Sequence, residues 1–281
     1  MGIDPAASDA GAFREIVRRA LEEDDAWNDV TTVATVPADA RGRSALVAKQ
    51  DCVLAGLDAF EAAFTEIDPT LVVERLAVDG ETVRAGASIA RISGSLRSIL
   101  VAERTALNFI QRLSGIATLT RAFVDAAGGT EIRDTRKTTP GLRDLEKAAV
   151  RAGGGTNHRR DLGSAILIKD NHIAAAGGLA AAVSAARKTG KHVEVECETL
   201  EQVRDALDAG ADELLLDNMA VTTLAKAVAL AKEKGCATEA SGGVTLESVG
   251  DIAKTGVDSI SVGALTHSAR AIDLSLEVEA G

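Results

Sequence analysis

The amino-acid sequence predicts an α/β protein in two parts: an N-terminal α+β sandwich-like domain followed by an open β/α barrel. The C-terminal half repeats a short aliphatic run and an alanine-rich helical segment every ~20 to 30 residues, as parallel βαβ units require. The N-terminal part lacks this rhythm and shows turn-rich segments typical of short antiparallel strands. An open doubly wound sheet is the alternative for the second part, but no G-x-G-x-x-G fingerprint follows a strand, which favours the barrel.

The N-terminal domain is expected over residues 1–112, and segment 270–281 is a candidate addition to it. Residues 12–23 have the spacing of an amphipathic helix, and short strands are expected within 44–56, 71–78 and 79–94. A long helix from about residue 97 to residue 127 follows. Its apolar residues Leu107, Ile110, Leu113 and Ile116 have the spacing of a buried stripe.

The barrel domain is expected over residues 113–269, with six strands. Their runs are EIRDT (131–135), AILIKD (165–170), HVEVEC (192–197), ELLLDN (213–218), ATEASGG (237–243) and DSISVGA (258–264). Helical segments such as LEQVRDALDAG and VTTLAKAVALAKEKG lie between them, and several end at a glycine, a common stop signal. Six such units fit a barrel better than an open sheet.

Composition limits the classes of function. The chain has 281 residues, 46% of them hydrophobic, and 42 acidic against 31 basic residues, which gives a pI near 4.9. Such a surface argues against a nucleic-acid partner, which requires a broad basic face. No apolar run reaches membrane-spanning length and the N-terminus has no signal pattern, so we expect a cytoplasmic protein without a membrane partner. Cys52, Cys197 and Cys236 form no CxxC pair, so neither a disulfide framework nor a zinc site is indicated.

One segment reverses the charge of the chain. Residues 131–172 hold nine Lys and Arg against six Asp and Glu, whereas the rest of the chain holds 22 against 36. A local reversal of this kind is typical of a place where an anion is held, because the remaining surface would repel it. A solvated helix face of mixed charge is the alternative.

Polar residues follow each predicted strand of the barrel. Arg136 and Lys137, Lys169 and Asp170, Glu196, Asp217, Glu239 with Ser241, and Gly263 stand at or beyond the strand ends. The carboxyl ends of barrel strands converge on one face, where active sites are built. The last two loops, SGGV and VGALTHS, place Gly242, Gly243 and Gly263 near helix starts, an arrangement typical of phosphate binding.

These residues also carry a family resemblance. ERTALNFIQRLSGIAT, DTRKTTPGLRDLEKAAVRAGGGTNHR, ILIKDNHI, VEVE, LLLDN, SGGV and VGALTHS, in this order from Arg104 to Asp273, resemble the quinolinate phosphoribosyltransferases, also called nicotinate-nucleotide pyrophosphorylases (carboxylating). Where the family usually has an aliphatic or acidic residue after VEVE, this chain has Cys197. The resemblance implies that quinolinate attacks phosphoribosyl pyrophosphate, with loss of pyrophosphate and carbon dioxide, to form nicotinate mononucleotide for de novo NAD synthesis.

The resemblance also implies roles for individual residues. The catalytic set would be Lys137, Lys169, Glu196 and Asp217, of which Glu196 and Asp217 would also hold Mg²⁺, partly through the substrate. The substrate-binding set would add Arg104, Thr135, Arg136, His158, Arg159, Ser241, Gly242, Gly243, Gly263, Ala264, Leu265 and His267. Arg104 would reach the site of a neighbouring subunit in a homodimer, or in a higher oligomer. Mg²⁺ suits this set because a hard cation prefers carboxylate and phosphate oxygens.

Two other functions remain open from the residues. One is a related pyridine phosphoribosyltransferase, either specific for nicotinate or one of the molybdate-cluster paralogues. It would keep the phosphate loops and alter the cations that bind the carboxylates of quinolinate. The intact NHR and DTRKT motifs argue against this alternative. A non-catalytic sensor of phosphoribosyl pyrophosphate or quinolinate would tolerate loss of Glu196 or Asp217, but both are present.

Overall fold

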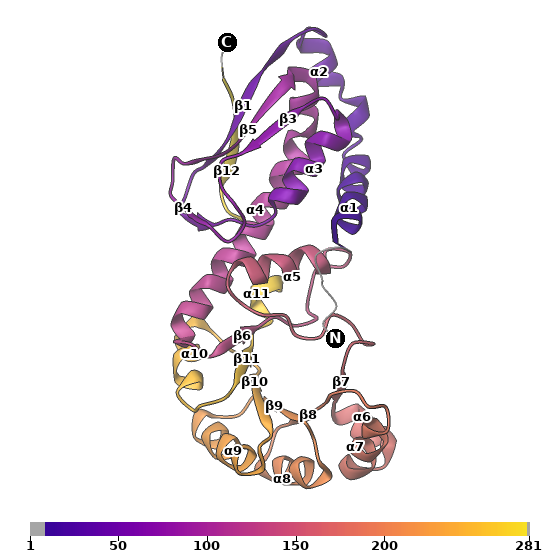
Figure 1. Ribbon diagram of the computed structural model, residues 1–281, viewed down its shortest axis with the longest axis vertical. Helices are drawn as coiled ribbons and strands as arrows, with labels where there is room; N and C mark the ends of the chain where they lie inside the picture. Colours follow the sequence, from indigo (N-terminus) through magenta and orange to yellow (C-terminus); the bar gives the residue numbers. More distant parts are fainter. Residues whose placement is uncertain (1–8, 280–281) are drawn as a thin grey trace. The chain divides into compact units, whose positions relative to one another are not determined.

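The computed structural model describes residues 9–279, which divide into two compact units (Figure 1). The first unit consists of the chain up to Leu119, Thr138–Gly154 and the chain from His267, and the second consists of Thr120–Lys137 and Gly155–Thr266. The expected barrel domain ran without interruption from 113 to 269, whereas the second unit omits 138–154. None of the described helices combines the length and the apolar character needed to cross a bilayer.

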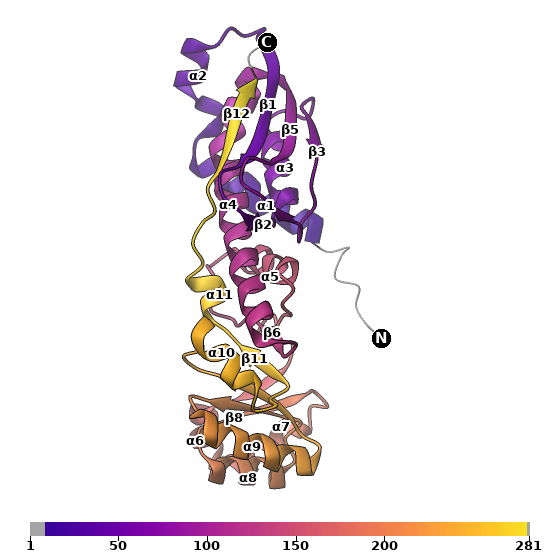
Figure 2. The same cartoon turned by 90° about the vertical axis from the view of Figure 1, so that its left-hand side faces the viewer.

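The first unit contains a four-stranded antiparallel sheet in the order β12-β1-β5-β3 (Figure 2). Its strands are β1 (Arg41–Ala48), β3 (Val72–Arg75), β5 (Ser88–Ser95) and β12 (Leu274–Glu279), and a separate pair is formed by β2 (Cys52–Val53) and β4 (Thr82–Val83). In β1, Leu46 pairs with Leu276 on one side and with Ala90 on the other. The C-terminal end of the chain therefore completes a sheet that the N-terminal residues began.

Most helices of the first unit bury apolar residues, whereas the short helix over residues 30–35 exposes Val30 and Val33. The helices are α1 (Asp9–Glu23), η2 (Ala26–Asn28), α2 (Val30–Thr35), α3 (Leu57–Ile67), α5 (Arg143–Ala152) and the first part of α4 (Leu96–Ala127). The carboxylate of Asp29 caps α2 by accepting the N–H groups of Thr31 and Thr32, which the first turn leaves without helical partners. In α3 the rings of Phe60 and Phe64 are in edge contact, with centroids 5.0 Å apart.

The long helix α4 confirms the expected apolar stripe, because Leu107, Ile110, Leu113 and Ile116 are all buried. The same helix holds α5 in the first unit: Arg112 of α4 donates to the buried carboxylate of Glu146, with 2.8 Å between Nη2 and Oε1. This ion pair gives a reason why segment 138–154 groups with the first unit rather than with the strands that flank it in sequence.

The second unit is built on a six-stranded parallel sheet in the order β6-β11-β10-β9-β8-β7. The strands are β6 (Glu131–Arg133), β7 (Ile166–Ile168), β8 (Val193–Cys197), β9 (Glu213–Asp217), β10 (Ala237–Ser241) and β11 (Ser259–Ser261), one within each run that the sequence indicated. Within the described residues no ladder joins the edge strands β6 and β7, so the barrel is open there. A parallel bridge from Arg133 to Thr156 extends the β6 edge.

Helices cover the outer face of this sheet (Figure 1). The helices that pack against its strands are α7 (Leu179–Arg187), α8 (Leu200–Ala209), α9 (Val221–Lys234) and α10 (Leu246–Ala253). Two shorter helices, α6 (Asp170–Ala176) and α11 (Ala264–His267), follow β7 and β11. Thr199 begins α8 with a capping box, in which its hydroxyl accepts the N–H of Gln202. The expected glycine stops are present at Gly210 and Gly235, which end α8 and α9 in the left-handed conformation.

Alternation along the strands separates two environments. In β8, Val193, Val195 and Cys197 are buried on one face, while Glu194 and Glu196 share the opposite face because successive side chains of a strand point to opposite sides. Adjacent strands continue this second face, since Glu194 pairs with Glu213 in the sheet register. The interior of the open barrel therefore carries acidic side chains on β8 and β9.

Candidate active site

A cavity of about 550 Å³ opens at the carboxyl ends of the strands in the second unit. The structure brings together there these residues that the sequence predicted: Thr135, Arg136, Lys137, His158, Arg159, Lys169, Glu196, Asp217, Ser241, Gly242 and Gly243. They come from five separate strand ends and from the loop that precedes β7. The convergence that the strand-end pattern predicted is thus present within a single unit.

Other predicted site residues are not among the lining residues of this cavity. Arg104 lies on α4 in the first unit, where its side chain is exposed. Gly263, Ala264 and Leu265 follow β11, and Leu265 is fully buried. His267 is exposed and hydrogen-bonds the hydroxyl of Ser268, 2.7 Å away. The expected second half of the phosphate cradle is therefore not part of the cavity wall as the structure has it.

Five lining residues had no assigned role in the predicted site, although the strand-end pattern included Glu239: Leu167, Leu215, Asn218, Glu239 and Ser261. Four of them stand two positions before a predicted residue of the same run: Leu167 before Lys169, Leu215 before Asp217, Glu239 before Ser241 and Ser261 before Gly263. Strand alternation places residues two apart on one face, so the period of the pattern could have identified them. Asn218 belongs to the quoted LLLDN motif.

One side of the cavity is cationic. Burial and the neighbouring charge of Arg136 lower the pKa of Arg159, which shows that two guanidinium groups lie close together. The Nε of Arg136 is buried, and no hydrogen-bond partner for it is found in residues 9–279. Arg159 donates from Nη1 to the carbonyl of Ala165 at 3.0 Å, which fixes its direction. Paired like charges with an unsatisfied donor indicate an anion-binding site.

Lys169 supplies a further cation between β7 and α6. Its backbone N–H donates to Nδ1 of His172 at 3.0 Å, so the histidine of the ILIKDNHI motif holds the turn that presents the lysine. The ammonium group of Lys169 is in direct contact with the carboxylate of Glu196, at the end of β8. In this structure the two predicted catalytic residues therefore neutralise each other.

The acidic side of the cavity consists of Glu196 and Asp217, at the ends of the neighbouring strands β8 and β9. Asp217 accepts from the side-chain amide of Asn218, with 2.6 Å between Nδ2 and Oδ2. No arginine forms an ion pair with either carboxylate among the described ion pairs. Two such carboxylates at adjacent strand ends offer the oxygen donors that a hard divalent cation prefers.

The glycine loop after β10 requires its glycines. Gly242 and Gly243 have φ values of +94° and +59°, a region that other residues rarely adopt. A Cβ on Gly242 would collide with the side-chain oxygen of Asn218. Asn218 itself has a positive φ of 53°, and its N–H donates to the carbonyl of Ser241 at 2.9 Å. The loops after β9 and β10 are therefore packed together and hydrogen-bonded to each other at the cavity wall.

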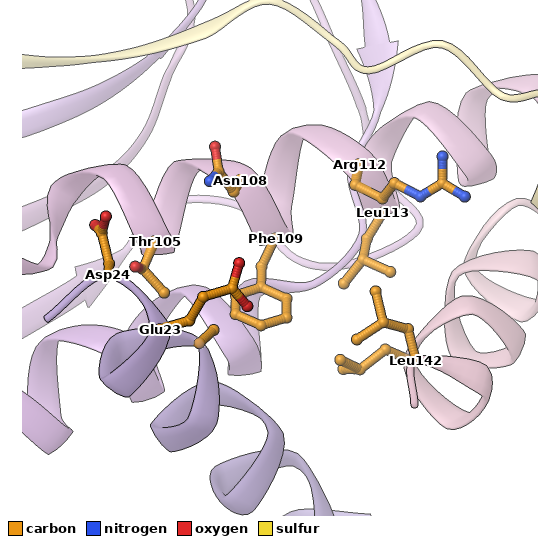
Figure 3. Close-up of a pocket in the computed structure, with 10 residues that line it drawn as sticks. Glu23, Asp24, Thr105, Asn108, Phe109, Arg112, Leu113 and Leu142 are labelled. Atoms are coloured by element: carbon orange, nitrogen blue, oxygen red, sulfur yellow. The ribbon is translucent and has the colours of Figure 1, made fainter. Parts of the chain in front are cut away.

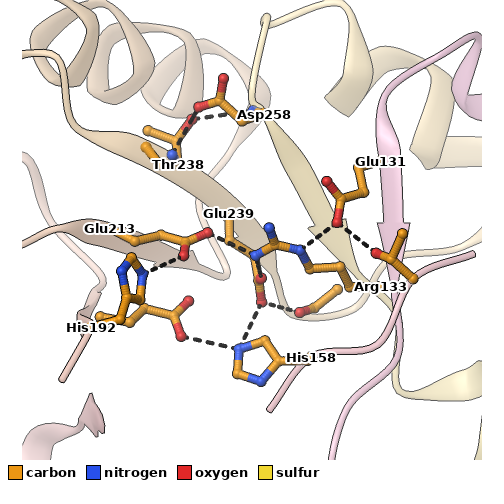
Figure 4. A network of polar contacts seen from close by, with 12 residues as sticks. Glu131, Arg133, His158, His192, Glu213, Thr238, Glu239 and Asp258 are labelled. Carbon is orange, nitrogen blue, oxygen red and sulfur yellow. Dashed lines mark hydrogen bonds and ion pairs between the residues drawn. The ribbon is translucent and has the colours of Figure 1, made fainter. Parts of the chain in front are cut away.

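An ionic network fills the barrel interior next to the cavity (Figure 4). Nη1 of Arg133 lies 2.7 Å from Oε1 of Glu213 and 2.8 Å from Oε2 of Glu239, and its Nε lies 2.9 Å from Glu131. Burial opposes the charge of Arg133, but the hydrogen bonds that it donates to Glu131 and Glu239 outweigh this and raise its pKa. One guanidinium thus ties together β6, β9 and β10 from inside the barrel.

His158 joins this network from the loop before β7. Its Nε2 lies 3.0 Å from Oε2 of Glu194 and 3.7 Å from Oε1 of Glu239. These three side chains could hold a metal ion by spacing alone, because their ligand atoms all lie within 4.8 Å of one another. The guanidinium of Arg133 already contacts Glu239, and its positive charge opposes a cation there. We therefore describe the cluster as an ionic hydrogen-bonded group.

A second cavity, of about 370 Å³, lies in the first unit between α1, α4 and α5 (Figure 3). Phe109 and Leu113 give it an apolar wall, and Glu23 and Asp24 stand at one side. Its lining includes Arg112, which is already bound to Glu146. This cavity contains none of the predicted site residues, so the candidate site is the cavity of the second unit.

Comparison with known families covers nearly the whole chain. The model described as "Quinolinate phosphoribosyl transferase, C-terminal domain" matches residues 116–277, and the model of the N-terminal domain of the same family matches residues 29–114.

Individual relatives agree with this. The Nicotiana tabacum protein "Quinolinate phosphoribosyltransferase (decarboxylating) 2b, mitochondrial" is 43% identical over 300 residues, covering 99% of this chain and 85% of that protein. The Mycobacterium leprae "Nicotinate-nucleotide pyrophosphorylase (carboxylating)" is 43% identical over 277 residues, covering 95% of this chain and 97% of that protein.

Solved structures give the same result. The nicotinate-nucleotide pyrophosphorylase of Francisella tularensis is 43% identical with a TM-score of 0.92, and covers 96% of this chain and 97% of that chain. Human nicotinic acid phosphoribosyltransferase, at 14% identity and a TM-score of 0.67, shares the fold alone, covering 91% of this chain and 74% of that chain.

Proposed function

This chain belongs to the quinolinate phosphoribosyltransferase family, and from that premise we propose that the cavity of its second unit is the active site. The protein is a decarboxylating pentosyltransferase of NAD biosynthesis, which converts quinolinate and phosphoribosyl pyrophosphate to nicotinate mononucleotide, pyrophosphate and carbon dioxide. The reversed charge of the 131–172 segment has its explanation here, because both substrates are strongly anionic and the rest of the chain is acidic.

The observation that carries the site assignment is the pair Arg136 and Arg159 beside Lys169. Quinolinate has two adjacent carboxylates, and the planar fork of a guanidinium bonds both oxygens of a carboxylate at once. Arg136 has a buried Nε that still lacks a partner, so a carboxylate oxygen would satisfy a donor that the protein leaves unpaired. Lys137, exposed at the rim of the same cavity, adds a fourth positive charge.

The phosphate end of the second substrate is assigned to the loop of Ser241, Gly242 and Gly243. A loop without side chains lets backbone N–H groups approach phosphate oxygens closely, and this loop precedes α10, whose N-terminus favours negative charge. Asn218 supports the loop from the β9 side. The two ends of the cavity then separate the carboxylates of quinolinate from the phosphate of the ribose.

We propose Mg²⁺ as the metal, held by Glu196 and Asp217. The donor set fits, because both groups are carboxylates that line the cavity at adjacent strand ends. When bound, the ion would supply positive charge that stabilises the leaving pyrophosphate. Lys169 would exchange its contact with Glu196 for a carboxylate of quinolinate, which leaves Glu196 available as a ligand.

Positioning and electrostatics then account for catalysis, without a protein nucleophile. The lone pair of the pyridine nitrogen forms the bond to C1′ as the bond to pyrophosphate breaks. The nitrogen becomes cationic, so the electron pair left at C2 after carbon dioxide departs is stabilised until it takes a proton. The protein's cations hold the carboxylates in place for the first step.

One assay tests the proposal. The protein is incubated with quinolinate, phosphoribosyl pyrophosphate and Mg²⁺, and carbon dioxide and pyrophosphate are followed together, with a matched sample that contains a chelator. Equal molar release of both products, abolished by the chelator, is expected. Binding of quinolinate without release of either product would indicate a sensor and contradict the enzymatic assignment.

We further propose a homodimer in which Arg104 serves the neighbouring site. Arg104 is exposed on α4, and it takes part in none of the described ion pairs and hydrogen bonds, so its charge is available to a ligand or partner.

We also propose a reducing compartment such as the cytoplasm, which is supported by three cysteines that are all buried and free. Cell fractionation tests this location, and recovery from an organelle, where several plant relatives are named to reside, would contradict it.

A further inference from the structure

The group formed by His158, Glu194 and Glu239 joins the cavity to the barrel interior. His158 and Glu239 line the cavity, whereas Glu194 lies behind them on β8. Nε2 of His158 faces both carboxylates, at 3.0 Å from Glu194 and 3.7 Å from Glu239 (Figure 4). The backbone N–H of His158 also donates to Oδ1 of Asp134 at 2.9 Å, so the loop that carries the ring is held as well.

The two carboxylates differ in how their charge is compensated. Glu239 forms an ion pair with Arg133 and accepts a hydrogen bond from the hydroxyl of Ser261. Glu194 is 4% exposed, and one of its oxygens is buried with no hydrogen-bond partner. Within residues 9–279, His158 is the single group that forms an ion pair with Glu194. A neutral imidazole would leave the buried carboxylate of Glu194 without a charged hydrogen-bond partner, so that the charge of Arg159 would act on it through space alone.

Some of the charged groups around the ring of His158 favour its protonated form, and others oppose it. Glu194 from β8 and Glu239 from β10 favour the imidazolium, Arg133 from β6 opposes it, and Asp134 lies at the backbone of the ring's own residue. The cations Arg136, Arg159 and Lys169 line the same cavity and also oppose it. The buried carboxylates Glu194, Glu213 and Glu239 outnumber Arg133, the guanidinium that contacts two of them.

We propose that Glu194 and Glu239 are positioning residues that keep His158 in its imidazolium form at neutral pH, so that this ring is a cation of the substrate cavity. The buried pair acts through the histidine and needs no contact with the substrate. The charge of the ring is thereby set by two buried carboxylates, of which Glu239 lines the cavity and Glu194 does not.

The direction of the pKa shift supports the geometry. Burial alone would lower the pKa of His158, but the hydrogen bond to Glu194 and the charge of Glu239 raise it above the ordinary value of 6.5. Burial and the neighbouring Glu194 raise the pKa of Glu239 as well, so the group as a whole retains a proton more strongly than its separate members. The positive charge of the ring is therefore present below the raised pKa and is lost as the pH rises through it.

A functional consequence follows for anion binding, and this part rests on the proposed function. A cationic His158 adds positive charge to the cavity, and this charge attracts a substrate carboxylate. Quinolinate affinity should then fall as the pH rises through the pKa of the ring. His158→Gln, which cannot carry the charge, should bind quinolinate about tenfold or more weakly at pH 6.5 and should lose this pH dependence.

The decisive experiment measures the charge of the ring directly, without substrate. The chain has four histidines, so their imidazole signals can be followed by NMR as the pH is raised, and His158→Gln identifies the signal of His158. We expect His158 to titrate above 6.5 in the unaltered protein, and to shift down by about one unit or more in Glu194→Gln and in Glu239→Gln.

A matched control is Glu213→Gln. It removes a carboxylate from the same interior network, where Glu213 contacts Arg133 and His192, but it leaves both partners of His158 in place. The titration of His158 should stay the same in this variant. Circular dichroism establishes that each variant is folded, and if the Glu194 and Glu239 variants do not fold, the titration of the unaltered protein decides.

Titration of His158 at or below about 6.5 would overturn the proposal, as would an equal downward shift in Glu213→Gln. Because the NMR measurement involves no reaction, its failure is distinguishable from failure of the enzymatic assignment. A protein that shows the raised titration but no turnover of quinolinate would leave the ring's charge established and would contradict the proposed function alone.

Discussion

Asp217 carries one of the two carboxylates at the acidic side of the cavity, and its replacement separates turnover from substrate binding. Asp217→Asn keeps the shape of the side chain and its contact with Asn218 while removing the charge. If Asp217 holds Mg²⁺ and the ribose, kcat should fall about a hundredfold or more, and quinolinate affinity, measured by calorimetry, should change little. Glu198→Gln, an exposed glutamate just beyond β8 that does not line the cavity, is the control for loss of charge. A matching loss of quinolinate affinity in Asp217→Asn would place Asp217 beside the carboxylates instead.

The paired arginines predict substrate choice. Nicotinate lacks the second carboxylate of quinolinate, so it would leave part of the Arg136 and Arg159 pair without a counterion in the cavity. A site built to bond a charged group rejects an analogue without it strongly, and we expect kcat/KM for nicotinate to be lower by about a thousandfold or more. Steady-state rates on both acids in the same preparation measure this. Similar rates would contradict the assignment of the arginines to a dicarboxylate.

Gly242 and Gly243 allow a comparison of two neighbouring substitutions. Gly242→Ala meets both an unfavourable φ of +94° and a collision with Asn218, whereas Gly243→Ala, at φ +59°, has its nearest neighbour 4.0 Å away. Gly242→Ala should therefore lower the free energy of unfolding by about 1–3 kcal/mol and raise the KM for phosphoribosyl pyrophosphate, and Gly243→Ala should have the smaller effect on both. Urea unfolding and initial rates give the two quantities. Equal effects of the two substitutions would show that the Asn218 contact does not matter.

At the scale of the element, the strands of the barrel carry polar residues both at their carboxyl ends and within the strand, and the sequence alone does not show which of the latter are buried. The reactive residues at the ends of β7, β8 and β9 could be predicted, because the carboxyl ends of parallel strands meet on one face. Glu194 could not, since an acidic residue alternating with valines in a strand usually faces solvent. Its burial depends on His158, which lies 36 residues earlier and meets it only in the folded barrel. The grouping of α5 with the first unit depends in the same way on the Arg112–Glu146 pair.

The charged interior also predicts how stability depends on pH. The folded-state pKa values of His158 and Glu239 are both raised, from ordinary values of 6.5 and 4.5. Each group therefore binds its proton more tightly in the folded chain. Its stabilising contribution is full below the ordinary pKa and is lost as the pH rises through the folded one. Unfolding free energy, measured with urea from pH 5 to pH 9, should decrease toward the alkaline end.

Glu239→Gln identifies the source of that decrease. The amide keeps the shape of the side chain but cannot ionise, so the variant should lose less stability than the unaltered protein between pH 5 and pH 9. Glu213→Gln, in the same network but without contact to His158, serves as the control. An unchanged pH dependence in Glu239→Gln would mean that other groups cause the alkaline loss.

On the scale of the whole molecule, an acidic chain that binds two anions must collect its cations at one place. Of 31 basic residues, Arg136, Lys137, Arg159 and Lys169 line a single cavity. Arg104 belongs to the same predicted binding set, but it lies in the first unit and is not among the lining residues. The sequence identifies Arg104 as a candidate by family resemblance, whereas the proposed shared site requires a second chain.

Complementation between two inactive variants tests that assembly. If each active site combines Arg104 of one chain with Lys169 of the other, Arg104→Ala and Lys169→Ala should each be nearly inactive alone, because each removes one cation from every site. In a mixed dimer the two lesions meet in one site, and the other site carries neither. Random pairing makes half of the dimers mixed, so co-expression should restore activity to roughly a quarter of that of the unaltered protein.

The two arrangements give opposite results because of where the lesions fall. If each chain supplied its own Arg104 and Lys169, every site in a mixed dimer would carry one lesion and co-expression would restore nothing. Distinct affinity tags on the two chains allow the mixed dimers to be purified, and there the expected recovery rises to about half, one intact site of two. Absence of activity in purified mixed dimers would refute the shared site, while the assignment of the reaction would stand, since it rests on the family of the chain and not on Arg104.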